Sequence, residues 1–284
     1  MFDLKGKAAL VTGASRGVGR GVALGLAEHG ATVHITARTL VDGTHPLEHA
    51  GGLEKVVADA GTLPGRIVPH RVDHANDAET EAVVRDVIAA EGRLDILVNN
   101  AWPGYERMEE KVEPGRNPFT WVAPPWEQPM WRWDAMINVG ARAAWCASRI
   151  ASGQMAEQKH GLIVNISFWA AQKFMQNAVY GIAKAAADKM AADLAVQLRE
   201  YGVAAVSLYP GLVRTEGVLK NAQYFDLTNS ESPEFLGYCV AGLASDPLLM
   251  EKSGKVHVAA ALAREYGFTD VDGKQPVPLT LQST

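Results

Sequence analysis

Short runs of β-branched and apolar residues alternate with longer amphipathic stretches along most of the chain. Near-continuous apolar runs are typical of parallel strands covered on both faces, and each crossover between such strands needs a connection long enough for a helix. Because these crossovers are right-handed, the alternation indicates a doubly wound, mostly parallel α/β sheet of about seven strands with helices on both faces. The predicted strands are 8–12, 32–36, 66–72, 94–98, 162–167, 203–208 and 254–258, and the predicted helices are 17–29, 47–60, 76–91, 131–158 and 177–201.

The overall composition narrows the class of protein. A chain of 284 residues that is 48% hydrophobic and 21% charged is not disordered, and we expect a single domain over 1–284. The net charge of −5 gives no basic field for nucleic acid. We see no signal peptide and no apolar run long enough to span a membrane, so we expect a cytoplasmic protein. The two cysteines offer neither a disulfide framework nor metal-ligand spacing.

Tryptophan and proline are concentrated in one place. Five of the seven tryptophans and six of the 14 prolines fall between residues 102 and 133, which predicts a long loop at 102–130. Long loops in compact domains are usually functional, and this one follows the fourth predicted strand, at the edge where open α/β sheets bind ligands. The aromatic side chains either form a wall for a bulky apolar substrate or pin the loop to the protein body. Trp133 is predicted to open the next helix, which leaves Trp102, Trp121, Trp126 and Trp131 around the loop.

A glycine-rich loop follows the first predicted strand. Its spacing is Gly-x-x-x-Gly-x-Gly, and a helix begins within it. Residues without Cβ allow a sharp turn, close approach to a pyrophosphate and tight packing of the helix on the sheet. The helix N-terminus then offers N–H groups to a phosphate. A turn without a ligand and a methyltransferase loop are the alternatives. The candidate dinucleotide-binding residues of this loop are Gly13, Ser15, Arg16, Gly17, Val18 and Gly19.

Five motifs occur in a fixed order. TGASRGVG at 12–19 is followed by Asp73 after the third strand, Asn99-Asn100-Ala101 after the fourth, Tyr180-x-x-x-Lys184 after the fifth, and Pro210-Gly211 after the sixth. Together they resemble the short-chain dehydrogenase/reductase family over nearly the whole chain. The stretches RLDILVNNAW, GLIVNIS, YGIAKAAADKMAADLA and DVDG are similar to one branch of that family.

The resemblance implies a Rossmann fold and hydride transfer between a nicotinamide cofactor and a carbonyl or secondary alcohol. It also implies a homodimer or homotetramer in which the fourth and fifth long helices pair. Asp73 would contact the adenine, and the Pro-Gly turn with the following threonine would contact the nicotinamide half. The cofactor-binding residues implied in this way are Asp73, Asn99, Ala101, Tyr180, Lys184, Pro210, Gly211, Val213 and Thr215.

The end of the second strand bears on the choice of cofactor. A carboxylate there accepts hydrogen bonds from a free ribose 2′-OH, whereas an arginine binds a 2′-phosphate. This chain has Ala37 at that position, then Arg38, with Arg16 in the glycine loop. Each arginine taken alone is equally compatible with a solvated surface residue. The pair favours NADP(H), and NAD(H) stays possible.

Tyr180 and Lys184 are four residues apart in a predicted helix and therefore share one face. A nearby ammonium lowers the pKa of a phenol and brings it into range for acid–base catalysis. By resemblance, Tyr180 exchanges the proton with the substrate oxygen and Lys184 also binds the nicotinamide ribose. Asn138, inside a predicted helix, would hold a water that relays protons to the lysine.

The family's substrate-polarising serine is uncertain in this chain. Ser167 lies 13 residues before Tyr180, but Phe168 stands where relatives carry a second serine. Either Ser167 polarises the substrate oxygen, or no serine does. Trp102, where relatives have glycine, and Phe168 are candidate substrate contacts, and residues 216–235 are the predicted substrate lid. A non-catalytic NADP(H)-binding or sensing protein on the same fold is the alternative function.

Overall fold

The computed structural model describes residues 2–44, 51–107 and 120–284. Its centre is a seven-stranded sheet of order β3-β2-β1-β4-β5-β6-β9, in which each neighbouring pair is parallel. This confirms the predicted doubly wound α/β fold and all seven predicted strands, with ends shifted by one or two residues. The strands are β1 Ala8–Thr12, β2 Thr32–Ala37, β3 Arg66–Arg71, β4 Ile96–Asn99, β5 Gly161–Ile166, β6 Val203–Tyr209 and β9 Val256–Val258.

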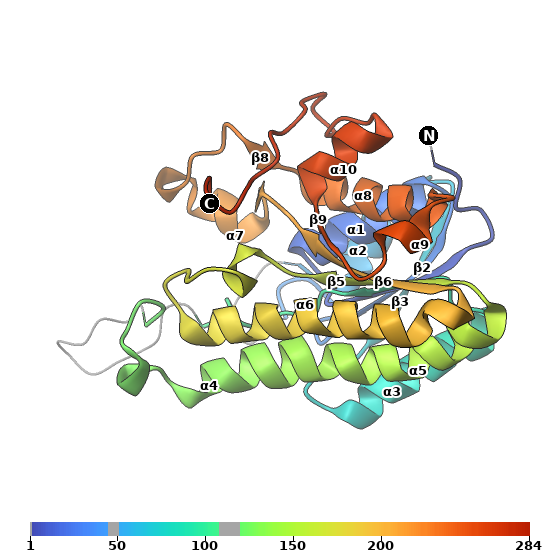
Figure 1. Ribbon diagram of the computed structural model, residues 1–284, viewed down its shortest axis with the longest axis horizontal. Coiled ribbons are helices and arrows are strands. Elements are labelled where there is room, and N and C mark those ends of the chain that lie inside the picture. Colours follow the sequence, from blue (N-terminus) through green and yellow to red (C-terminus); the bar gives the residue numbers. More distant parts are fainter. Residues whose placement is uncertain (1, 45–50, 108–119) are drawn as a thin grey trace.

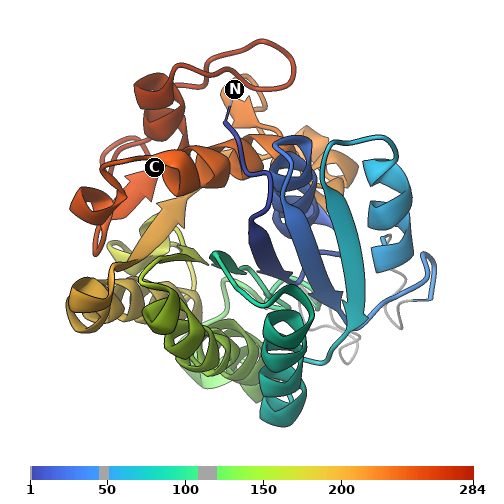
Figure 2. The same cartoon turned by 90° about the vertical axis from the view of Figure 1, so that its right-hand side faces the viewer.

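Two layers of helices enclose the sheet (Figures 1 and 2). Side chains alternate along each strand, so that in β1 Val11 packs into one hydrophobic core and Leu10 into the other. One layer consists of α1 Gly17–Glu28, α2 Leu53–Ala60, α8 Pro233–Ser245 and α10 Ala259–Tyr266, and the other of α3 Asp77–Glu91, α5 Ala143–Gln158 and α6 Ala178–Leu198. None of the helices in the described parts of the chain is long and apolar enough to cross a membrane.

One helix prediction needs correction at its start, and another proves to contain a change of helix type. The helix predicted at 47–60 begins at Leu53, and residues 47–50 lie outside the described residues. The helix predicted at 131–158 begins with α4 Met130–Trp133, continues as a π-helix over Asp134–Arg142, and ends as α5. Trp131 therefore belongs to this helix and not to the loop before it.

The segment at about 216–235, predicted as a substrate lid, is partly helical. It contains α7 Glu216–Lys220, the 3₁₀ turn Ala222–Tyr224, and β8 Ser230–Glu231, which pairs with β7 Leu212–Val213. The end of the segment overlaps α8, which begins at Pro233, with the Ser232 hydroxyl accepting from the Phe235 N–H. The sequence pattern missed α8 because it is buried on nearly every side against α1 and the sheet, which leaves no polar face. The short helix α9 spans Leu249–Lys252.

Candidate active site

A cleft of about 2170 Å³ lies at the carboxyl ends of the central strands. Open α/β sheets bind ligands at this edge. The structure brings to this cleft every predicted site residue except Asn138. The predicted residues that line it are Gly13, Ser15, Arg16, Gly17, Val18, Gly19, Arg38, Asp73, Asn99, Ala101, Trp102, Ser167, Phe168, Tyr180, Lys184, Pro210, Gly211, Val213 and Thr215.

The glycine loop is shaped by close backbone contacts. Gly13 has a φ of +68°, and a Cβ on it would lie 2.6 Å from the Ala101 Cα. A Cβ on Gly19 would lie 2.3 Å from Asn100 Nδ2. At the start of α1, the Gly17 N–H donates to Glu216 Oε2 at 2.9 Å. A carboxylate thus already takes the place that an anion favours at a helix N-terminus.

The two predicted phosphate-binding arginines converge on one carboxylate. Arg38 Nη2 donates to both oxygens of Glu106 at 2.6 Å, and Arg16 Nη2 donates to Glu106 Oε1 at 3.1 Å. Arg16 Nη1 is buried, and among the described residues it has no hydrogen-bond partner. Burial also lowers the pKa of Arg16. Two partly desolvated guanidinium groups beside the glycine loop fit an anion such as a ribose phosphate.

Tyr180 and Lys184 lie in the first turns of α6, at the floor of the cleft. Tyr180 is 6% exposed and Lys184 is 7% exposed. Burial lowers the pKa of Lys184 to about 8, and its Nζ donates to the Ile166 carbonyl oxygen at 3.1 Å. The expected lowering of the Tyr180 pKa is not found: Lys184 Nζ lies 5.8 Å from the tyrosine ring centre, and burial raises the pKa of Tyr180 well above its usual value. The phenol is therefore held in its neutral, proton-donating form.

Aromatic rings surround Tyr180. The ring centroid of Trp102 lies 5.7 Å and that of Trp121 lies 5.3 Å from the Tyr180 centroid, and Tyr105 lies 6.2 Å away. Phe168 packs against the same cluster. Trp102 lines the cleft, whereas Trp121 is buried behind it, so both predicted alternatives, a substrate wall and a pinned loop, stay predictions. Trp126, in contrast, is 83% exposed.

Asn177 connects the aromatic cluster to α6. As the N-cap of α6, its Oδ1 accepts from the Tyr180 N–H at 3.0 Å. Its Nδ2 donates to the Trp121 carbonyl at 2.9 Å and to Gln128 Oε1 at 3.1 Å. The sequence analysis missed Asn177, although an asparagine three residues before a helical tyrosine is a recognisable cap signal.

Two predicted catalytic residues have other partners. The buried Ser167 hydroxyl donates to the Lys184 carbonyl oxygen at 3.2 Å. Contrary to expectation, Asn138 is exposed outside the cleft and donates to Asp134 Oδ1 at 3.0 Å. It lies in the π-helix, where the larger number of residues per turn changes which face a side chain occupies. The polarising role of Ser167 and the water-relay role of Asn138 stay predictions.

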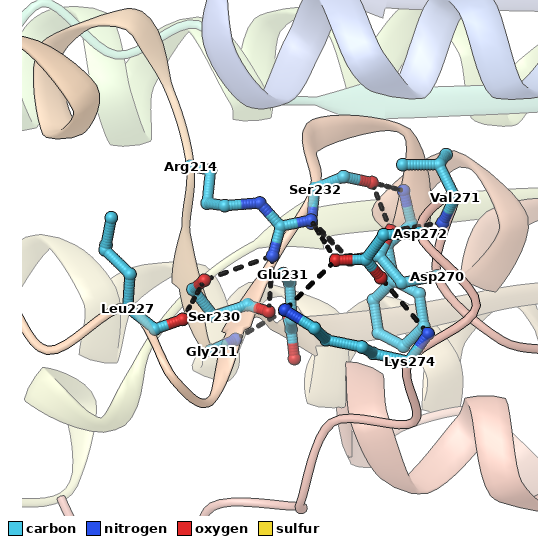
Figure 3. Close-up of polar contacts among 11 residues, drawn as sticks. Gly211, Arg214, Leu227, Ser230, Glu231, Ser232, Asp270, Val271, Asp272 and Lys274 are labelled. Carbon is cyan, nitrogen blue, oxygen red and sulfur yellow. Dashed lines mark hydrogen bonds and ion pairs between the residues drawn. The ribbon is translucent and has the colours of Figure 1, made fainter.

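The Pro-Gly turn after β6 is held by a buried polar network (Figure 3). Glu231 Oε2 accepts from the Gly211 N–H at 2.7 Å. Glu231 is 2% exposed, and this burial raises the pKa of its carboxyl group to about 7. The turn that faces the cleft is therefore positioned by a carboxyl group from β8.

The same network reaches the C-terminal segment. Arg214 donates to the Ser230 carbonyl at 2.8 Å and to Asp270 Oδ2 at 3.0 Å. Asp270 in turn accepts from the Ser232 N–H at 2.7 Å, at the start of α8 (Figure 3). Sequence reasoning noted the DVDG stretch at 270–273 but not this role, because its partners lie about 40 to 60 residues away along the chain.

Comparisons with known proteins agree with this geometry. A family model described as short chain dehydrogenase matches residues 7–223. Dehydrogenase/reductase SDR family member 1 of Mus musculus is 39% identical over 285 residues, covering 95% of this chain and 85% of the mouse protein. A metagenomic short-chain oxidoreductase solved in complex with NADP is 27% identical, with a TM-score of 0.68 over 90% of this chain and 96% of that chain. A short-chain type dehydrogenase/reductase from Mycobacterium marinum, 24% identical, has the same fold with a TM-score of 0.70 over 90% and 95%.

These likenesses confirm the family resemblance drawn from the five motifs. They also confirm the expected branch, since the mouse protein belongs to the branch that the RLDILVNNAW and DVDG stretches indicated. The chain therefore belongs to the short-chain dehydrogenase/reductase family and is an oxidoreductase that acts on CH–OH or carbonyl groups.

Proposed function

We propose that the protein is an NADP(H)-dependent carbonyl reductase or alcohol dehydrogenase with Tyr180 as general acid and base. The observation that carries this proposal is the convergence on one cleft of the glycine loop, the Arg16–Arg38 pair and the Tyr180–Lys184 pair. NADP(H) is preferred over NAD(H) because the two arginines provide cations where a 2′-phosphate would bind. The NADP complex of the metagenomic relative supports the same choice.

The chain offers groups for each part of the dinucleotide. Arg16 and Arg38 would hold the 2′-phosphate, with Asp73 beside the adenine. The N-terminus of α1 would hold the pyrophosphate, because the Gly17 N–H already binds a carboxylate. Lys184, Asn99, Ala101 and the segment from Pro210 to Thr215 would face the nicotinamide half. The cofactor supplies the hydride, and the protein supplies orientation and the proton.

Tyr180 would donate its proton to the substrate oxygen during reduction and accept it during oxidation. Burial raises the pKa of the phenol in the free protein, so the proposal requires the bound cofactor and Lys184 to lower it toward the working pH. The aromatic rings around it favour a substrate with a bulky apolar group next to the carbonyl. Ser167, if its hydroxyl leaves the Lys184 carbonyl, would polarise the substrate oxygen.

The test is NADPH oxidation with a panel of ketones and quinones. The wild type should consume NADPH, and Tyr180→Phe should lower kcat by about 1000-fold while NADPH binding persists. Phe168 and the engaged Ser167 hydroxyl favour one rival, a non-catalytic NADP(H)-binding or sensing protein. Tight NADPH binding without turnover of any substrate in the panel would support that rival instead.

Two further expectations belong to this proposal. A homodimer or homotetramer through α5 and α6 is supported by Trp145 and Ile182, which are exposed apolar side chains on these neighbouring helices (Figure 1). A cytoplasmic location stays a prediction.

A further inference from the structure

We propose that residues 102–107, called here the closing turn, occupy the cofactor groove in the free protein. The 2′-phosphate of the cofactor displaces the closing turn by binding Arg16 and Arg38 in place of Glu106. Glu106 would then be a specificity-determining residue. This inference rests on the proposed NADP(H) function. The observation behind it is that the closing turn lines both ends of the cleft.

At the adenine end, Glu106 holds both arginines. Its two carboxylate oxygens accept from Arg38 at 2.6 Å, and one of them accepts from Arg16 at 3.1 Å. The Glu106 side chain is more buried than either arginine side chain, with 16% exposed against 27% and 46%. A carboxylate and a phosphate seek the same guanidinium N–H groups, so the two anions exclude each other there.

At the nicotinamide end, the same segment covers the catalytic lysine. The Trp102 ring centre lies 4.0 Å from Lys184 Nζ, within the range of a cation–π contact. The indole fits because a Cβ at Gly140 would lie 2.8 Å from its ring. Trp102 and Lys184 thus lie in contact in the lining of the cleft.

The two ends are coupled through a compact turn. The Glu106 N–H donates to the Pro103 carbonyl at 3.0 Å, and Gly104 is buried against the Trp102 ring. On this proposal, displacing Glu106 shifts the turn that also carries Trp102. A cofactor with a 2′-phosphate competes for the arginines and uncovers Lys184, whereas a cofactor with a free 2′-OH leaves the carboxylate in place.

The first test measures binding of the adenine half alone by calorimetry. We expect Glu106→Gln to bind 2′,5′-ADP about fivefold more tightly than the wild type, since part-exposed ion pairs compete only moderately. The affinity for 5′-AMP, which lacks the 2′-phosphate, should change by less than about twofold. Glu127→Gln is the matched control, because Glu127 is an exposed carboxylate further along the same loop; it should behave as the wild type.

The second test measures whether release of Glu106 from the two arginines changes the surroundings of Trp102. Binding of 2′,5′-ADP, which lacks the nicotinamide half, should change the tryptophan fluorescence of the wild type. The change should be lost in Trp102→Phe, which removes the reporter, and in Glu106→Gln, where the turn is already released. A fluorescence change that persists in Trp102→Phe would overturn the coupling.

The outcomes also separate this inference from the proposed function. If neither the wild type nor Glu106→Gln binds 2′,5′-ADP, the NADP(H) preference is wrong and the inference falls with it. If both bind 2′,5′-ADP with equal affinity, the NADP(H) preference stands and the role of Glu106 is overturned.

Discussion

The glycine loop after β1 and the Pro-Gly turn after β6 line the same cleft but are held in different ways. The glycine loop is fixed by tight contacts with the segment that follows β4, such as the approach of Gly13 to Ala101. The Pro-Gly turn is fixed by buried charged and polar side chains, with Glu231 on the Gly211 N–H and Arg214 on Asp270. The first region depends on the absence of side chains, and the second depends on their presence.

This difference has a consequence for mutation and pH. A loop held by tight contacts of glycines tolerates no added atoms at those positions. A turn held by a buried carboxyl group keeps its packing when side chains change slightly, but the charge of that carboxyl group changes near neutral pH. Substitution of Gly19 tests the first region, and substitution of Glu231 tests the second.

The largest effect is expected at the glycine loop. A Cβ at residue 19 would lie 2.3 Å from Asn100 Nδ2 and 2.4 Å from the Gly13 carbonyl, so Gly19→Ala must displace the loop. We expect NADPH affinity to fall by about 1000-fold, or about 4 kcal/mol. Titration of NADPH fluorescence measures the affinity.

The matched control is Gly153→Ala. Gly153 is an exposed glycine within α5, and no atom lies within 4 Å of a Cβ placed on it. This variant should keep NADPH affinity and gain about 0.5–1 kcal/mol of stability from helix propensity. Equal NADPH affinities for the two variants would contradict the steric account of the loop.

An intermediate effect is expected at Glu231. Its folded-state pKa of about 7 exceeds its usual value of 4.5, so the folded protein holds a proton that the unfolded chain releases between these pH values. The unfolding free energy should therefore fall by about 3 kcal/mol as pH rises from 4.5 to 7, and Glu231→Gln should lack this loss. Urea unfolding at pH 4.5 and 7.5 measures it.

The control for the Glu231 prediction is Glu157→Gln, which removes an exposed carboxyl from the last turn of α5. Its stability should follow the wild type across the same pH range. A wild type and a Glu231→Gln variant with parallel pH profiles would show that the buried carboxyl does not titrate in this window.

The smallest effect is expected at Ser167. Because its hydroxyl donates to the Lys184 carbonyl, Ser167→Ala removes one buried hydrogen bond, and kcat should fall by less than about fivefold. Steady-state kinetics with the best substrate of the panel measures this. A loss near 100-fold, comparable with removal of an oxyanion donor, would mean that the hydroxyl changes partner and polarises the substrate.

Much of the fold could be predicted because its signals are local. Each strand of the sheet is a short apolar run, and α1, α3 and α6 lie within one to three residues of their predicted ends. Helix α8 is not among the predicted helices, because burial on nearly all sides leaves it no amphipathic pattern. The face taken by Asn138 could not be predicted, because no sequence signal marks the π-helix over Asp134–Arg142.

The sequence by itself determined the alternation that makes the sheet, the glycine loop, and a tyrosine and lysine on one helical face. These features depend on residues within a few positions of one another, whose relation is set by backbone geometry. Only the tertiary structure decided that Glu106 lies between Arg16 and Arg38, that Trp102 covers Lys184, and that Glu231 supports Gly211. These contacts join residues 20 to 90 positions apart, and such side chains meet only when the packed sheet brings their loops to one edge.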